Sequence, residues 1–323
     1  MPINSMEKTS ISLEDRFNGC LLGAAIGDAL GMPTEYLQKS YFEKFYKGKV
    51  MDFENPLPDS PCGHLKAGQY TDDTQQIIVL AKSLIKNHGF NIEGFAKDLG
   101  EWGWKCRNKK DYNRFGGGTS INAAIEIYNG KNCNETGRNT SSCGAAMRIA
   151  PIGLFYNKNM KLLKDYAIDA SRITHKNLTA IDSAVLVSSI IATLANGKKP
   201  IEAIESANNN EVEYNLRKNV SYAIGNKDLE PNEVASFIGV SENAKETVPM
   251  AIYCFLHSPD DYEKTVINAA NLVPGDTDSI ACIAGAISGA YNGIKKIPKR
   301  FLEKIESRNE LENMARDLYL EAL

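Results

Sequence analysis

Two short acidic segments, far apart in the sequence, carry the residue types that could do chemistry. Each stands directly before a predicted helix and combines two carboxylates with a hydroxyl: Thr71, Asp72 and Asp73 in the first, and Asp276, Asp278 and Ser279 in the second. Helix capping could explain either segment alone, because Asp, Ser and Thr are favoured at helix N-termini. If the segments met in space, their four carboxylates would repel one another unless a cation lay among them. Hard divalent cations accept such oxygen ligands, so the spacing leaves open a choice between two capped helices and a metal site.

The elements that must position these residues are mostly helical. Apolar residues recur at helical spacing in many stretches, and short connections rich in Gly, Pro and Asn separate them. We predict helices at 75–86, 123–128, 178–196, 201–207, 211–224, 232–238, 247–256, 261–272 and 279–291. Alternating strand patterns are nearly absent, and no internal repeat is found. The sequence therefore predicts one compact all-α domain over residues 1–323, with residues 198–244 as a candidate peripheral helical subregion.

Composition and charge limit the classes of function. Of the 323 residues, 43% are hydrophobic and 24% charged, which is typical of a globular protein with a sizeable core. The net charge of −3 gives no electrostatic reason to expect binding to nucleic acid or to an anionic membrane. The weakly polar stretch 19–32 contains Asp28 and is too short to span a bilayer. No signal-peptide pattern is present, so we expect a cytoplasmic protein. The oligomeric state stays open, and the sequence is compatible with a monomer.

The cysteines and histidines argue against a soft-metal site. Seven cysteines lack paired spacing, and only four histidines are present. A disulfide framework and a Cys/His zinc site are therefore not expected, and the pattern fits reduced thiols in the cytosol. Any bound metal should have oxygen ligands. No Cys/His spacing supports a nucleophilic role for Cys143.

Six motifs, in this order, resemble the ADP-ribosylglycohydrolase family between residues 17 and 294. They are the glycine-rich run 19–31 that leads to Glu35, Tyr-Thr-Asp-Asp-Thr at 70–74, Gly-Gly-Gly-Thr-Ser at 116–120, Gly-Ala-Ala-Met-Arg at 144–148, Thr-His at 174–175 and Gly-Asp-Thr-Asp-Ser at 275–279. The resemblance implies a compact orthogonal multi-helix bundle with two Mg²⁺ or Mn²⁺ ions at its centre. It implies as metal ligands Thr71, Asp72, Asp73, Asp276, Asp278 and Ser279. Ser279 stands where many relatives have Thr, and it keeps the hydroxyl oxygen.

The same resemblance adds residues that face the substrate. Glu35 alone could be a solvated acid, but the family pattern places it beside the metals, and the predicted catalytic set is Glu35, Asp72 and Asp278. The glycine loop could be a flexible turn; the resemblance favours a site where Gly117, Gly118, Thr119 and Ser120 receive the pyrophosphate of ADP-ribose at a helix N-terminus.

A second loop resembles the one that wraps the distal ribose, and its predicted binding residues are Ser142, Cys143, Gly144 and Met147. His175, which could otherwise be a core histidine, is predicted to bind substrate. We interpret Arg148 as a buried ion-pair partner rather than a phosphate ligand. Asp28 is interpreted as a structural acid that holds its own turn.

The resemblance implies metal-assisted hydrolysis that releases ADP-ribose from an ADP-ribosylated protein or a small ADP-ribosyl conjugate. We prefer ADP-ribosyl-arginine as the substrate, by analogy at the level of the fold. ADP-ribosyl-serine, poly(ADP-ribose) and O-acetyl-ADP-ribose are alternatives. A non-catalytic relative that binds ADP-ribose or serves a structural role is a further alternative, against which the six oxygen ligands argue.

Overall fold

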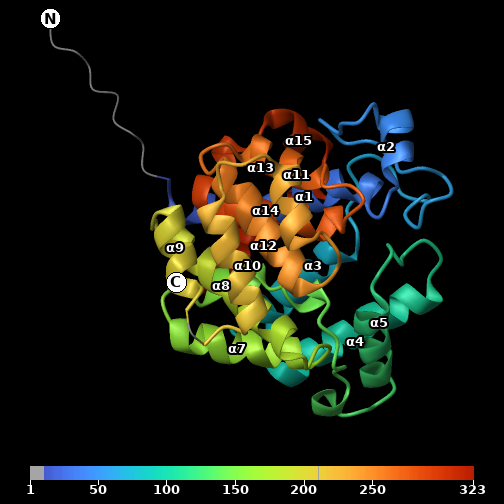
Figure 1. Cartoon of the computed structure of the whole chain (residues 1–323). Coiled ribbons are helices and arrows are strands. Elements are labelled where there is room, and N and C mark those ends of the chain that lie inside the picture. Colours follow the sequence, from blue (N-terminus) through green and yellow to red (C-terminus); the bar gives the residue numbers. More distant parts are fainter. Residues whose placement is uncertain (1–10, 210) are drawn as a thin grey trace, which may run out of the picture.

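The computed structural model describes residues 11–209 and 211–323, so residues 1–10 and 210 of the predicted domain lie outside it. Within these ranges the chain forms helices and no strand (Figure 1). The α-helices are α1 (Leu13–Gly31), α2 (Lys39–Tyr46), α3 (Asp72–Lys86), α4 (Ile92–Asn108), α5 (Gly118–Tyr128), α6 (Ala150–Phe155), α7 (Met160–Arg172), α8 (Leu178–Ala195), α9 (Pro200–Ala207), α10 (Tyr214–Gly225), α11 (Pro231–Ile238), α12 (Ala244–His257), α13 (Tyr262–Ala270), α14 (Thr277–Asn292), α15 (Lys299–Lys304) and α16 (Arg308–Glu321). The all-α prediction is confirmed, and the nine predicted helices are present as α3, α5 and α8 to α14.

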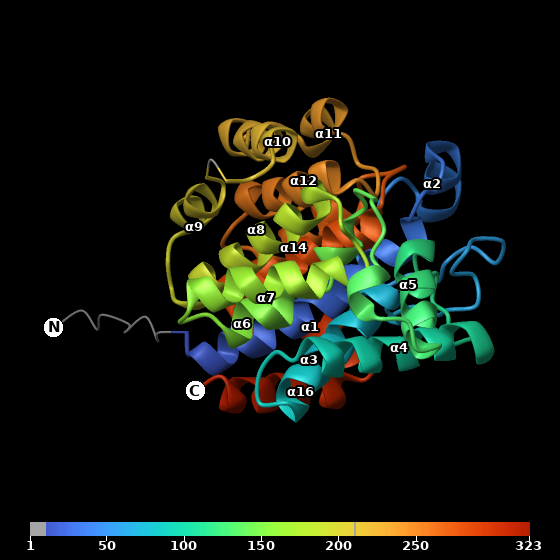
Figure 2. The same cartoon turned by 90° about the horizontal axis from the view of Figure 1, so that it is seen from below.

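Helices α1 and α14 pack against each other through the centre of the molecule (Figure 2). Glycine recurs at every fourth position of α1, at residues 19, 23, 27 and 31, and each of these glycines faces the backbone of α14. A Cβ atom at Gly27 would lie 1.9 Å from the carbonyl oxygen of Ala281, and one at Gly23 would lie 2.5 Å from that of Gly285. The two backbones are therefore in direct contact, which only glycine permits. This contact fixes the C-terminal end of α1 relative to the N-terminal end of α14.

The variant Gly27→Ala is expected to destabilise the fold by about 3 kcal/mol, because the two backbones must separate to admit the methyl group. Urea unfolding followed by circular dichroism measures the loss. The matched control is Gly225→Ala, since Gly225 also lies in a helix but a Cβ there meets no atom within 4 Å. Equal losses in both variants would mean that the α1–α14 contact is not the cause.

Helix α8 is long and apolar enough to cross a membrane by length and composition, with a mean hydropathy of 1.8. However, 72% of this stretch is buried inside the protein. It packs against α6, α7, α12 and α14. These are the contacts of a core helix.

The segment 198–244 contains α9, α10 and α11, which lie along one edge of the molecule (Figure 2). Its apolar side chains still reach the main core, where Leu216, Val220 and Val234 are fully buried. Helix α10 packs on α12. The segment is therefore peripheral in position but continuous with the central core.

Candidate active site

The acidic residues singled out in the sequence converge on one pocket of about 390 Å³, a size that suits a small-molecule ligand. Its walls come from the segment after α1, the starts of α3, α5 and α14, and the loop that precedes α6. The lining residues are Glu35, Tyr36, Asp72, Asp73, Phe115, Gly116, Gly117, Gly118, Thr119, Ser120, Thr140, Ser142, Cys143, Gly144, Met147, His175, Glu242, Asp276, Asp278 and Ser279.

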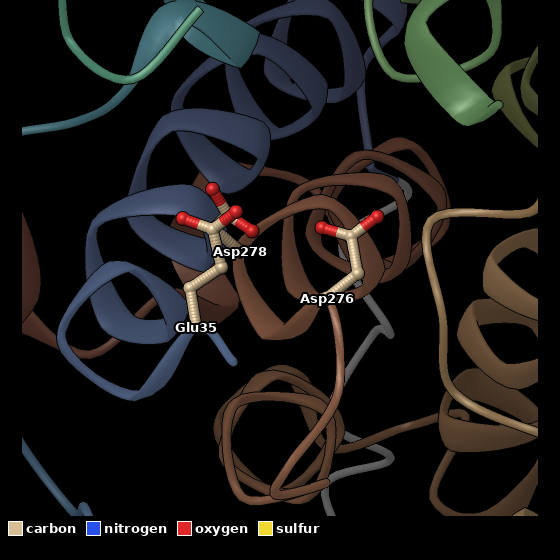
Figure 3. Close-up of side chains that lie close together, drawn as sticks. All are labelled: Glu35, Asp276 and Asp278. Carbon is tan, nitrogen blue, oxygen red and sulfur yellow. The ribbon is translucent and has the colours of Figure 1, made fainter. Parts of the chain in front are cut away.

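Three acids form a tight group at the junction of α1 and α14 (Figure 3). One carboxylate oxygen from each of Glu35, Asp276 and Asp278 lies within 4.8 Å of the other two. Glu35 follows α1, whereas the two aspartates stand at the start of α14. The backbone N–H of Tyr36 donates to the carbonyl oxygen of Gly275 at 2.9 Å, which ties the two segments together. The packing of α1 on α14 therefore sets the spacing of these carboxylates.

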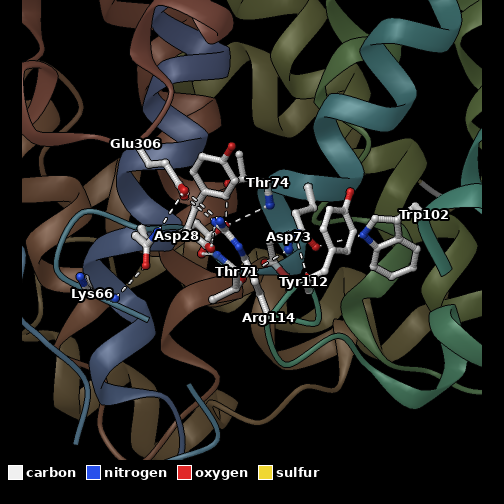
Figure 4. A network of polar contacts seen from close by, with 12 residues as sticks. Asp28, Lys66, Thr71, Asp73, Thr74, Trp102, Tyr112, Arg114 and Glu306 are labelled. Atoms are coloured by element: carbon white, nitrogen blue, oxygen red, sulfur yellow. Dashed lines mark hydrogen bonds and ion pairs between the residues drawn. The ribbon is translucent and has the colours of Figure 1, made fainter. Parts of the chain in front are cut away.

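Capping does not account for the two carboxylates of the first acidic segment, because Asp28 and the hydroxyl of Thr71 cap α3 (Figure 4). Asp28 lies inside α1, and its carboxylate accepts from the backbone N–H of Thr71 at 2.9 Å and from that of Thr74 at 3.0 Å. The Thr71 hydroxyl oxygen accepts from the N–H of Asp73 at 3.3 Å. The prediction that Asp28 holds its own turn is thus wrong, since it holds α3. Asp72 and Asp73 are left without a capping role, and Oδ2 of Asp73 is buried with no hydrogen-bond partner.

The second acidic segment is also only partly explained by capping. Asp276 occupies the N-cap position of α14, but its side chain makes no capping hydrogen bond. Instead its carboxylate accepts from the thiol of Cys143 at 3.2 Å. Asp278 accepts the backbone N–H of Ser279 at 2.9 Å through one oxygen. Carboxylate oxygens therefore remain for a ligand at both segments.

Burial, reinforced by repulsion from neighbouring carboxylates, raises the pKa of these acids. The pKa of Asp72 is raised to about 7, first by burial and then by Asp278. The pKa values of Glu35, Asp73 and Asp278 are raised well above the ordinary range, again first by burial and then by a nearby aspartate. The described residues that line the pocket include no lysine or arginine. A dense set of oxygen donors with an orphaned carboxylate oxygen and no side-chain cation fits hard divalent cations.

In the absence of a divalent cation, the free energy of unfolding is expected to fall as the pH rises from about 5 to about 8. The carboxyl pKa values are raised in the folded protein but lie near 4 in the unfolded chain, so the folded protein binds more protons across this range. For each carboxyl that stays protonated only in the folded protein, the free energy of unfolding falls by about 1.4 kcal/mol per pH unit. We expect a total decrease of about 2 kcal/mol or more between pH 5 and pH 8.

Urea unfolding in EDTA at several pH values measures this dependence. Saturating Mg²⁺ or Mn²⁺ should restore stability at the alkaline end, because a bound cation favours the ionised carboxylates. The variant Asp278→Asn should show a shallower profile. Stability that stays flat or rises with pH in EDTA would contradict the prediction.

The glycine loop is held against the first acidic segment. The N–H of Asp72 donates to the carbonyl oxygen of Arg114 at 3.3 Å, and its carboxylate accepts from the N–H of Gly117. Arg114 pairs with Glu306 and lies over the ring of Tyr70, 5.0 Å from its centroid (Figure 4). A Cβ at Gly117, the N-cap of α5, would meet no atom within 4 Å. The pocket thus borders the open N-terminus of an α-helix, a feature that binds anions.

The opposite wall is neutral and hydrogen-bonded. This wall is formed by the segment that precedes α6. Isolated β-bridges join its residues Arg138 to His175 and Ser142 to Asn243, so two neighbouring segments hold it in place. The Ser142 Oγ atom lies 3.0 Å from Nε2 of His175. A Cβ at Gly144 would lie 2.8 Å from Cε1 of this imidazole, so glycine leaves room for the ring. Burial, together with the nearby guanidinium of residue 148, lowers the pKa of His175 to about 3, so the ring is neutral.

All the predicted site residues except Thr71 line the pocket. Thr71 is fully buried behind the wall, and its role as a metal ligand stays a prediction. Sequence reasoning missed four lining residues, Tyr36, Phe115, Thr140 and Glu242, whereas Gly116 belongs to the predicted glycine motif. Tyr36 and Phe115 have positive φ values of 49° and 65°. Tyrosine and phenylalanine rarely adopt this conformation, so the sequence did not predict how these side chains are directed. Glu242 comes from the segment before α12, where no motif points to the site.

Comparison with known proteins agrees with this geometry. A family model described as ADP-ribosylglycohydrolase matches residues 9–323. An uncharacterized protein of Archaeoglobus fulgidus is 38% identical over 95% of this chain and 97% of its own length. ADP-ribosylhydrolase ARH3 of Bos taurus is 28% identical over 94% of this chain and 92% of its own length.

ADP-ribosylarginine hydrolase Tri1 of Serratia proteamaculans is 27% identical over 94% of this chain and 79% of its own length. A solved structure described as an ADP-ribosylglycohydrolase-related protein complex is similar, with a TM-score of 0.80 and 27% sequence identity. That similarity covers 97% of this chain and 99% of the other. The similarities therefore extend over nearly the whole chain.

Proposed function

Because the chain belongs to the ADP-ribosylglycohydrolase family and is a hydrolase that removes ADP-ribose, we propose that it cleaves ADP-ribosyl-arginine at a dinuclear cation site. The observation that carries this proposal is the convergence of Glu35, Asp276 and Asp278 in a pocket that Asp72 and Asp73 also line. Two features support the arginine linkage. One relative is named an ADP-ribosylarginine hydrolase. In addition, a pocket bordered by six carboxylates favours a leaving group that carries a positive guanidinium.

We propose that Asp72, Asp73, Asp276 and Asp278, with the hydroxyls of Thr71 and Ser279, hold two Mg²⁺ or Mn²⁺ ions. The hard oxygen donors, the orphaned Oδ2 of Asp73 and the raised carboxyl pKa values support this assignment. Bound there, the cations would supply Lewis acidity toward the ribose hydroxyls and the attacking water.

The remaining roles fall to groups of the chain itself. Glu35 is the predicted acceptor of the proton from the attacking water, because this half-buried residue lines the pocket and its raised pKa makes it a better base once ionised. The N-terminus of α5 would receive the pyrophosphate of the substrate. Ser142 and the neutral His175 would bind the distal ribose of the substrate without adding charge to the site.

Release of free ADP-ribose from defined substrates tests the proposal. ADP-ribosyl-arginine, ADP-ribosyl-serine, poly(ADP-ribose) and O-acetyl-ADP-ribose would each be incubated with Mg²⁺, with Mn²⁺ and with EDTA. We expect cation-dependent release from ADP-ribosyl-arginine. Faster release from ADP-ribosyl-serine would replace the arginine assignment. Binding of ADP-ribose with no release from any substrate would favour a non-catalytic binding protein.

We also propose that the protein acts in the cytoplasm on ADP-ribosylated proteins or small conjugates. All seven cysteines are free and buried, as in proteins of reducing compartments. Immunofluorescence or cell fractionation of the native protein would test the location.

A further inference from the structure

Arg148 is a fully buried cation whose hydrogen bonds go only to neutral groups. Nη1 donates to Oε1 of Gln76 at 2.8 Å, and Nη2 donates to the carbonyl oxygen of Ala170 at 3.0 Å and to Oγ1 of Thr174 at 2.6 Å. The prediction of an ion-pair partner is wrong, since none of these acceptors is a carboxylate. A buried guanidinium with no carboxylate hydrogen-bonded to it is costly, so its position calls for a reason beyond packing.

A guanidinium can only donate hydrogen bonds, so each of its partners must accept through an oxygen. Because the Thr174 hydroxyl accepts from Arg148, its single proton is left for another acceptor. Nδ1 of His175 lies 2.7 Å away, whereas the carbonyl oxygen of Ser171 lies 3.5 Å away. The much shorter distance assigns the hydroxyl proton to Nδ1, and the neutral imidazole then carries its own proton on Nε2.

The same direction continues to the pocket wall. With its proton on Nε2, His175 donates to the Oγ atom of Ser142 at 3.0 Å. Thr140 Oγ1, at 3.5 Å, is the other hydroxyl near this oxygen. The Ser142 oxygen thus accepts from the imidazole, and the hydroxyl proton of Ser142 is free to be donated. Because Ser142 lines the pocket, it can donate this proton to a bound ligand.

A second branch from Arg148 reaches the acidic wall. Since Oε1 of Gln76 accepts from Arg148, the amide nitrogen of Gln76 must face the other way. That nitrogen donates to Oδ2 of Asp72 at 2.8 Å. One cation thus sets the orientation of a donor on each side of the pocket.

We propose that Arg148 is a positioning residue that makes Ser142 a hydrogen-bond donor to an acceptor oxygen of the bound ligand and makes Gln76 a donor to Asp72. Arg148 touches neither ligand nor reacting atoms; it acts through Thr174, His175 and Gln76. The proposal rests on the proposed function only in naming ADP-ribose as the ligand, whose phosphate and ribose oxygens are acceptors of this kind.

The variant Thr174→Val tests the branch to Ser142, because it keeps the side-chain shape and removes the hydroxyl. Long-range ¹H–¹⁵N NMR reports which imidazole nitrogen carries the proton, and a chain with four histidines allows assignment by comparison with His175→Asn. We expect the Nε2-protonated form alone in the native protein and a mixture of both tautomers in Thr174→Val. Calorimetry should show that the Kd for ADP-ribose is raised about tenfold in Thr174→Val, the effect of one lost hydrogen bond. In a separate assay of ADP-ribose release, kcat should change less than about twofold.

Two further variants separate positioning from general stability. Thr265→Val is the matched control, because Thr265 is equally buried and its hydroxyl lies within hydrogen-bond distance of the carbonyl oxygens of Ser258 and Asp261, away from the pocket. It should lower the melting temperature but leave the Kd for ADP-ribose unchanged. Gln76→Leu should lower kcat through Asp72 while the tautomer of His175 stays as in the native protein.

A native protein with the proton on Nδ1 of His175 would overturn the proposal. So would an unchanged tautomer and Kd in Thr174→Val, or a Kd raised equally by Thr265→Val. The tautomer is measured without ligand. A native protein that bound no ADP-ribose would therefore end the proposed function and leave the hydrogen-bond direction still measurable.

Discussion

Replacing Asp278 by alanine is expected to abolish ADP-ribose release while the helical circular dichroism spectrum stays that of the native protein. Asp278 lies beside Glu35 and Asp276, and its charge also reaches Asp72 and Asp73, whose pKa values it raises. It is therefore the carboxylate that the two acidic segments share. If Asp278 holds the cations as proposed, its loss should lower kcat at least about 1,000-fold, the scale of metal-assisted catalysis.

The fold should tolerate this change. The hydrogen bond that Asp278 accepts from the N–H of Ser279, in the first turn of α14, is worth about 1 kcal/mol, and removing a buried repelling charge offsets that loss in the cation-free protein. Asp261→Ala is the matched control, since Asp261 caps α13 through the N–H of Lys264 outside the pocket. It should lose similar stability and keep turnover. Unfolding of Asp278→Ala, or near-native turnover, would show that Asp278 is only a structural cap.

Glu35→Gln is expected to lower kcat about 100- to 1,000-fold with KM changed only a few-fold, because the amide keeps the size of the side chain but cannot accept a proton. Steady-state release of ADP-ribose measures both constants. Thermal stabilisation by Mn²⁺ should persist in this variant, since Glu35 is assigned to proton transfer rather than to the ligand set. Loss of that stabilisation would make Glu35 a metal ligand instead.

Glu242→Gln provides the comparison for Glu35. Glu242 lies at the exposed rim of the same pocket, where its carboxylate accepts from the hydroxyl of Tyr36 at 3.2 Å. If the carboxylate of Glu242 attracts the guanidinium of the substrate, Glu242→Gln should raise KM and leave kcat nearly unchanged. A kcat as low as that of Glu35→Gln would mean that proton transfer is not specific to Glu35.

Periodicity predicted nine of the sixteen α-helices in the described residues and missed α1, α2, α4, α6, α7, α15 and α16; the reason is visible for three of these. Helix α1 is buried on all sides and carries four glycines, so no apolar stripe marks it. Helix α4 is interrupted by Gly94, Gly100 and Gly103, which lower helix propensity. Helix α16 is rich in charge, with a narrow buried face. Local sequence carries too little signal in each case.

The site could be predicted as a set of motifs but not as a geometry. The residue types at the two acidic segments fit both capping and metal binding, and only the structure reveals that Asp28, from another helix, caps α3 in place of Asp72 and Asp73. The partners of Arg148 and the position of Glu242 likewise come from contacts across the fold. Such contacts depend on tertiary packing, which spacing along the chain does not encode.

The glycine contact between α1 and α14 also has a consequence for how the protein is made. The hydroxyl of Thr277 donates to the carbonyl oxygen of Gly31, 246 positions earlier in the chain. During synthesis α1 therefore leaves the ribosome long before α14 is made. Until then the apolar surface of α1 that packs on α14 stays exposed in the nascent chain. Chaperone engagement during synthesis should concentrate on α1 and end when α14 emerges, the step at which catalytic competence first arises.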